Sequence, residues 1–135
     1  MADSSLKFIV DECIPPVLAT FMMKLRAGYL YSMRDEGHDY LGKPDEEWIP
    51  AATNRGFIII TCDRNMLKTK AIANALHKAQ AIAIFLPSYF AQATPYDKTL
   101  WLLKVWPKIR EYAATMKSGD TIKITQRGQI TSAIK

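Results

Sequence analysis

Carboxylates stand at the ends of two of the most apolar segments of the chain. Asp11 directly follows "LKFIV" (6–10), and Asp63 follows "FIIIT" (57–61) with one residue between. Short apolar runs rich in β-branched residues predict buried strands, so we expect each carboxylate at the carboxyl end of a strand. Oxygen ligands of this kind suit Mg²⁺ or Mn²⁺, which activate water and support the in-line displacement of a phosphodiester bond.

Further acids are expected at the same edge of the sheet. Residues 44–55 predict a helix that leads into the strand at 57–61 and carries three acids in its first turn, Glu46 among them. Asp35 comes two residues after a predicted strand at 29–33. Carboxylates gathered at one edge repel one another unless a cation lies between them. Each acid alone is more often a turn or helix-start residue, so the metal prediction rests on their convergence.

Strands and helices alternate along the rest of the chain. Helical spacing of apolar residues and alternating apolar residues predict helices at 14–28, 69–80 and 96–116, a strand at 81–86, and a C-terminal β-hairpin within 119–135. Such alternation is typical of βαβ units. The sequence therefore predicts an α/β fold with a mainly parallel sheet.

Size and composition favour one domain over residues 1–135, because 135 residues that are 49% hydrophobic can bury one sizeable core. No apolar run reaches the ~18 residues of a membrane span, so we expect a cytoplasmic protein without a membrane partner.

Lys and Arg outnumber Asp and Glu by 18 to 13, and this net charge of +5 favours a polyanionic partner. Cys13 and Cys62 form no CxxC pair and are expected to be reduced, buried thiols.

Three segments together resemble a known family. "FIVDECIPP" (8–16), "PDEEWIPAATNRGFIIITCDRNML" (44–67) and "LLKVWPKIREY" (102–112) are similar to PIN-like nuclease domains, especially the small toxins of prokaryotic toxin-antitoxin modules. The resemblance covers most of the chain. It implies a three-layer α/β/α Rossmann-like fold with an acidic pocket that binds Mg²⁺ or Mn²⁺ and cleaves RNA.

The resemblance also implies a role for each acid. Asp11 matches the first-strand acid, Glu46 the helix acid and Asp63 the acid of the "TxD" motif. Asp11 and Asp63 are expected to hold the metal, with Asp35 as an additional ligand. Glu46 is expected to bind the metal through water or to orient the nucleophile.

The expected partners follow from the same family. Arg34, Arg64 and Lys68 lie beside or shortly after the predicted carboxyl edge, which suits contact with RNA phosphates and equally suits a solvated basic face. The partners that the resemblance implies are an RNA substrate, a cognate antitoxin protein and, because relatives often dimerise, a second copy of the chain. Trp48 is expected in the core or at a partner contact rather than stacked on a base.

Two other interpretations stay open at this point. A PIN-like module that binds RNA or a protein without cleaving is favoured by Asn65, which stands where many relatives have a second Asp, and opposed by the three catalytic acids. A response-regulator-like receiver would suit the adjacent acids at 11 and 12, but it requires a Lys on a later strand, and residues 81–89 supply none.

Overall fold

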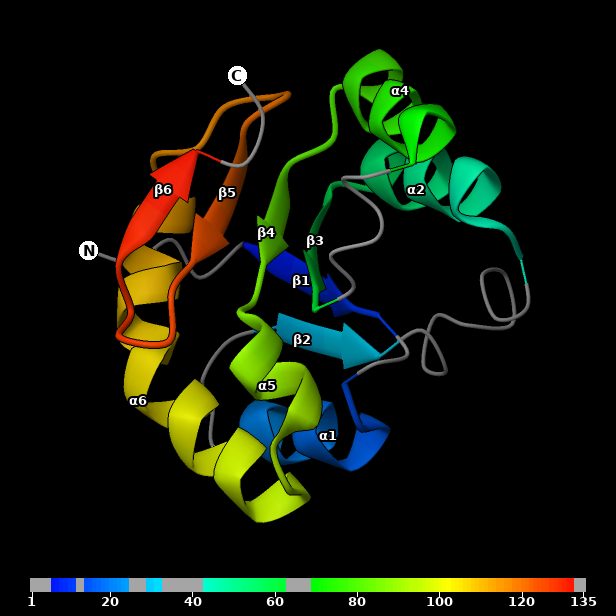
Figure 1. Ribbon diagram of the computed structural model, residues 1–135. Coiled ribbons are helices and arrows are strands. Elements are labelled where there is room, and N and C mark those ends of the chain that lie inside the picture. Colours follow the sequence, from blue (N-terminus) through cyan, green and yellow to red (C-terminus); the bar gives the residue numbers. More distant parts are fainter. Residues whose placement is uncertain (1–5, 12–13, 25–28, 33–42, 63–68, 133–135) are drawn as a thin grey trace.

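One sheet organises the chain in the computed structural model, which describes residues 6–11, 14–24, 29–32, 43–62 and 69–132. Within these ranges the sheet has six strands in the order β2-β1-β3-β4-β5-β6 (Figure 1). The strands are β1 (Lys7–Val10), β2 (Tyr29–Ser32), β3 (Phe57–Thr61), β4 (Ala83–Phe85), β5 (Thr121–Ile124) and β6 (Ile130–Ser132). All neighbouring pairs are parallel except β5 and β6, which pair antiparallel. The predicted α/β class and mainly parallel sheet are therefore confirmed.

The described helices connect these strands. They are α1 (Pro16–Lys24), α2 (Asp45–Asn54), α4 (Lys70–Ala79), α5 (Ser88–Gln92) and α6 (Pro95–Ala113). Pro44 precedes α2 in an extended conformation, three acids occupy its first turn, and Gly56 follows its end with a positive φ of 85°. Both α2 and α6 continue through their internal prolines, Pro50 and Pro107.

The short helix α5 has no counterpart among the predicted elements. Its five residues are too few to show helical periodicity in the sequence. Pro87 precedes it in an extended conformation, and the fully buried Phe90 fixes it to the core beside α6. Tertiary packing, rather than local propensity, therefore accounts for this helix.

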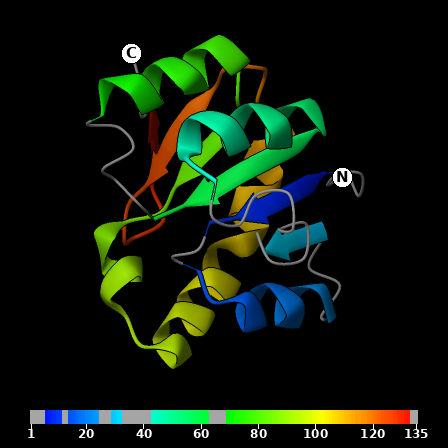
Figure 2. The same cartoon turned by 90° about the vertical axis from the view of Figure 1, so that its right-hand side faces the viewer.

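Both faces of the sheet are covered, as Figures 1 and 2 show. In β1 and β3 alternate side chains enter different cores: Ile9 and Ile59 pack with α2 and α4, whereas Val10 and Ile60 pack with α1 and α6. A strand that is buried on both faces is apolar throughout, which explains the uninterrupted run of β3.

The strand order decides where a ligand can approach. From β1 the chain moves first to β2 on one side and then to β3 on the other side of β1. In open α/β sheets the crevice for ligands lies beyond the carboxyl ends of the strands, at the point where the order reverses. Here that point is the junction of β1 and β3. None of the helices in the described ranges combines the length and hydropathy that crossing a bilayer requires.

Candidate active site

Asp11 stands at the junction of β1 and β3. Its N–H donates to the carbonyl oxygen of Ile60 at 3.0 Å, so the backbone ladder between the two strands extends one residue past the end of β1. Side chains alternate along a strand, and Ile9 faces α2 and α4. The half-buried carboxylate of Asp11 is therefore on the same side of the sheet as these two helices.

The hydroxyl of Thr61 holds this carboxylate. Thr61 Oγ1 donates a hydrogen bond to Asp11 Oδ2 at 2.8 Å, although the two residues are fifty positions apart in the chain. Thr61 is fully buried at the end of β3, so its hydroxyl is fixed by the surrounding core. A hydrogen bond of this kind to a metal-binding carboxylate fixes its orientation. The sequence analysis gives Thr61 no role, although Thr61 is the threonine of the "TxD" motif and the polar residue that ends an otherwise apolar strand.

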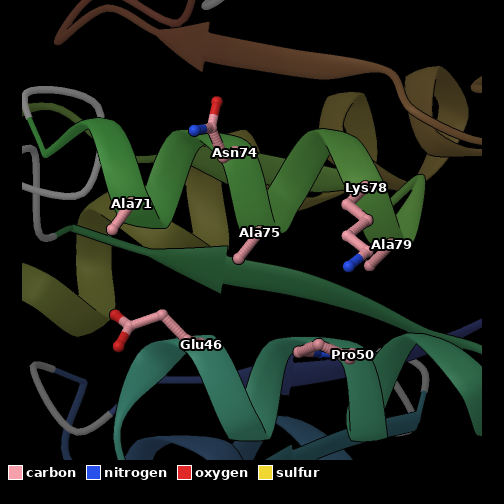
Figure 3. A pocket seen from close by; sticks show the side chains of 7 residues that line it. All are labelled: Glu46, Pro50, Ala71, Asn74, Ala75, Lys78 and Ala79. Atoms are coloured by element: carbon pink, nitrogen blue, oxygen red, sulfur yellow. The ribbon is translucent and has the colours of Figure 1, made fainter.

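The three acids in the first turn of α2 have different environments. Asp45 Oδ1 accepts a hydrogen bond from Trp48 Nε1 at 2.7 Å, so Asp45 fixes a tryptophan that is only 1% exposed. Trp48 is thus a core residue, which excludes base stacking. Glu47 is exposed, and Glu46 is exposed but lines a pocket towards α4 (Figure 3). The structure therefore singles out Glu46 as the acid of this turn that faces a cavity.

That pocket lies between α2 and α4 and has a volume of about 590 Å³. Its walls are mostly small side chains, with one carboxylate and one ammonium group: Glu46, Pro50, Ala71, Asn74, Ala75, Lys78 and Ala79. Figure 3 shows Glu46 near Ala71 and Lys78 near Ala79, so the two charges lie towards opposite ends. Because α2 leads into β3 and α4 follows it, both helices begin at the carboxyl edge of the sheet. Glu46 and Asp11 therefore share this edge and this face, although Asp11 does not line the pocket.

Several predicted site residues lie outside the described residues. They are the two further metal ligands, Asp35 and Asp63, and the three predicted phosphate contacts, Arg34, Arg64 and Lys68. Within the described ranges, no three His, Cys, Asp or Glu side chains gather closely enough to hold a metal ion. The donors that are described, Asp11 and Glu46, are oxygen ligands of the type that Mg²⁺ and Mn²⁺ prefer, so their chemistry fits the predicted ion. The full ligand set stays a prediction.

The expectation of reduced thiols is wrong for Cys62. Cys62 is buried and disulfide-bonded in the structure. Cys13, the other cysteine of the chain, lies outside the described residues. The sequence indicates only that each cysteine closely follows a strand, whereas the pairing of β1 with β3 brings the ends of those strands together. Spacing along the chain does not reveal that neighbourhood.

Comparison with protein-family models identifies a family for most of the chain. A family described as a PIN-like domain matches residues 6–88, a segment that includes β1 to β4 and the described acids of the candidate site. No curated protein matches the chain. No solved structure matches it either.

Proposed function

The chain belongs to the PIN-like domain family, and on this basis we propose that it is a metal-dependent endoribonuclease that hydrolyses phosphodiester bonds of RNA. PIN-like domains are generally nucleases and typically use divalent metals. Membership also leaves the receiver-like interpretation without support. The further proposal that the protein is a toxin neutralised by a cognate antitoxin rests on the sequence resemblance.

One observation carries the proposal. The carboxylate of Asp11 is held by the Thr61 hydroxyl at the β1–β3 junction, where the strand order reverses. The buried hydroxyl of Thr61 holds the carboxylate of Asp11 in a defined orientation before a metal ion binds.

The acids divide the chemistry among them. Asp11 and Asp63 would hold Mg²⁺ or Mn²⁺, with Asp35 as an additional ligand. The bound ion would supply charge stabilisation for the transition state and a more acidic water. Glu46, exposed at the start of α2, would orient the attacking water and accept its proton.

The remaining elements of the proposal concern partners. Arg34, Arg64 and Lys68 contact RNA phosphates, and a cognate antitoxin and a second copy of the chain are the protein partners. We also propose a cytoplasmic location. The disulfide at Cys62 argues against that location, because disulfides persist mainly in oxidising compartments.

The test is cleavage of a mixed RNA pool by the purified protein in Mn²⁺ or Mg²⁺. We expect products with 3′-hydroxyl ends, no cleavage in EDTA, and a rate at least about 10³-fold lower for Asp11→Asn and Asp63→Asn. Glu111→Gln removes an exposed acid of α6 and serves as the control, with a rate close to that of the wild type. Cleavage that survives both EDTA and Asp11→Asn would contradict a metal-dependent mechanism.

A PIN-like module that binds without cleaving is the second candidate, because Asn65 stands where many relatives have an Asp. It predicts that the folded wild type leaves every RNA intact in either metal and still binds RNA or a protein partner. The same assay, combined with a binding measurement in EDTA, separates the two candidates.

A further inference from the structure

A second polar pocket lies at the other end of the sheet, between α6 and the turn that joins β5 to β6. Its volume is about 670 Å³, and its lining residues are Lys104, Thr125, Gln126, Arg127 and Gln129. Two of these side chains are cationic, the other three are neutral hydrogen-bonding groups, and none is acidic. Arginine and lysine together with uncharged donors are the groups with which proteins bind phosphate.

The turn itself is tightly constrained. The N–H of Thr125 donates to the Gln129 carbonyl at 2.8 Å, and the N–H of Gly128 donates to the Thr125 carbonyl at 2.8 Å. Thr125 Oγ1 accepts a third bond, from the N–H of Gln129, at 3.0 Å. Gly128 has a φ of 87°, a conformation that L side chains rarely adopt. The backbone that carries Arg127 is thus held in one conformation.

A hydrogen bond from helix α6 anchors this turn. Trp101 Nε1 donates to the carbonyl oxygen of Gln126 at 2.9 Å, and Trp101 is itself buried against Phe90. Lys104 follows three residues later on the same helix. The bond therefore fixes the backbone of the turn relative to helix α6, so only the side chains of Lys104 and Arg127 have to be ordered when a ligand binds.

The pocket and Asp11 lie at the same edge of the sheet but towards opposite faces, because Lys104 belongs to α6 whereas Asp11 is on the side of α2 and α4. β5 runs parallel to β4, β3 and β1, so the turn after β5 lies at the carboxyl edge, where Asp11 follows β1. Three strand spacings separate β1 from β5 along this edge, which is about 14 Å at roughly 4.8 Å per strand, and a strand that joins the two sites also crosses from one face of the sheet to the other. A few nucleotides of an extended strand can span such a distance, whereas a mononucleotide cannot reach from one site to the other.

We propose that the pocket formed by Lys104, Arg127 and the β5–β6 turn binds a backbone phosphate of single-stranded RNA and so directs the strand along the carboxyl edge towards Asp11. This inference rests on the proposed ribonuclease function for its ligand, and the residues that carry it are separate from the predicted catalytic acids. Lys104 and Arg127 neutralise the phosphate, while Gln126 and Gln129 offer amide donors to its oxygens or to the neighbouring ribose. Such contacts bind the strand without selecting its sequence.

The experiment measures binding of a fluorescent single-stranded RNA by anisotropy in EDTA, at salt concentrations between about 50 and 200 mM. Every protein carries Asp11→Asn, so that no hydrolysis occurs. Against this parent, Lys104→Gln/Arg127→Gln is expected to bind at least about tenfold more weakly, with the slope of log K against log [salt] reduced by about 1.4 for two lost contacts. Lys108→Gln removes an exposed lysine one turn further along α6 that does not line the pocket, and it is the matched control.

Conservative replacement provides a second variant. Arg127→Lys keeps the charge and should retain the salt slope of the parent. A double glutamine variant that binds RNA like the Lys108→Gln control overturns the inference, as does a parent protein that binds no RNA. Stronger binding of an oligoglutamate peptide than of RNA, lost in the double variant, also overturns it and indicates an acidic protein partner.

Failure of the inference is distinguishable from failure of the proposed function. If the wild type cleaves RNA in Mn²⁺ and the double variant binds RNA as well as the parent does, only the inference fails. If no RNA is cleaved but binding depends on Lys104 and Arg127, the ribonuclease function fails and the phosphate site stands.

Discussion

The two ends of the carboxyl edge are built in different ways. At the β1–β3 junction, the carboxylate of Asp11 depends on a hydroxyl fifty residues away in the chain. At the β5–β6 turn, the bonds between Thr125 and Gln129 span four residues, and the anchor from Trp101 to Gln126 spans twenty-five. One end presents an anionic group beside a buried core, and the other presents two cations on a constrained turn.

The two regions are expected to respond differently to substitution. The orientation of Asp11 exists only once β1 and β3 are paired, so it is sensitive to a change at the end of either strand. The turn is formed mainly by its own residues, so a change in the anchor loosens its position but leaves its local bonds in place. We therefore expect substitutions at the β1–β3 junction to lower the rate of RNA cleavage and substitutions at the turn to lower the affinity for RNA.

The largest of the remaining effects is expected at Glu46. Glu46→Gln should lower the rate of RNA cleavage by roughly 10²-fold, because an amide cannot accept the proton of the attacking water. Glu47→Gln alters an exposed neighbour that does not line the pocket, and its rate should stay close to that of the wild type. Initial rates in Mn²⁺ provide the comparison. Equal losses in both variants would show that the first turn acts through its charge alone.

A smaller effect is expected at Thr61, where Thr61→Val removes the hydroxyl but keeps the shape. Without this donor the Asp11 carboxylate loses its orientation, so both the cleavage rate and the affinity for Mn²⁺ should fall by roughly tenfold. Thr61→Ser restores a hydroxyl and should recover most of the loss. Thr121→Val changes another buried threonine of the sheet and serves as the control. Wild-type Mn²⁺ affinity in Thr61→Val would contradict a positioning role.

The smallest effect is expected at the anchor of the turn. Trp101→Phe removes the bond to the Gln126 carbonyl and should lower the free energy of unfolding by about 1–2 kcal/mol. RNA affinity should fall only a few-fold, since Lys104 and Arg127 remain. Trp106→Phe alters a buried ring that packs edge-on against Phe8, with the ring centroids 5.0 Å apart, and should leave RNA affinity unchanged. Thermal unfolding and anisotropy together separate the two tryptophans.

Much of the architecture could be predicted because it is encoded by local patterns. The apolar runs at 6–10 and 57–61, followed directly or after one residue by an acid, predicted β1 and β3, and proline with three acids predicted the start of α2. The short helix α5 was not predictable, since five residues show no periodicity and it depends on the burial of Phe90. The disulfide at Cys62 was not predictable either, because neither cysteine belongs to a recognisable motif.

The sequence alone determined which residues could supply chemistry: oxygen ligands after apolar strands, an acidic first turn in α2, and an excess of positive charge. The tertiary structure decided how they are used. Asp45 accepts a hydrogen bond from the buried Trp48, whereas Glu46 lines a cavity. The hydroxyl of Thr61 donates a hydrogen bond to Asp11. The tertiary structure also brought Lys104 to the β5–β6 turn. Local patterns record burial and backbone preference along the chain, whereas strand order sets which distant residues become neighbours, and that order is fixed only when the sheet packs.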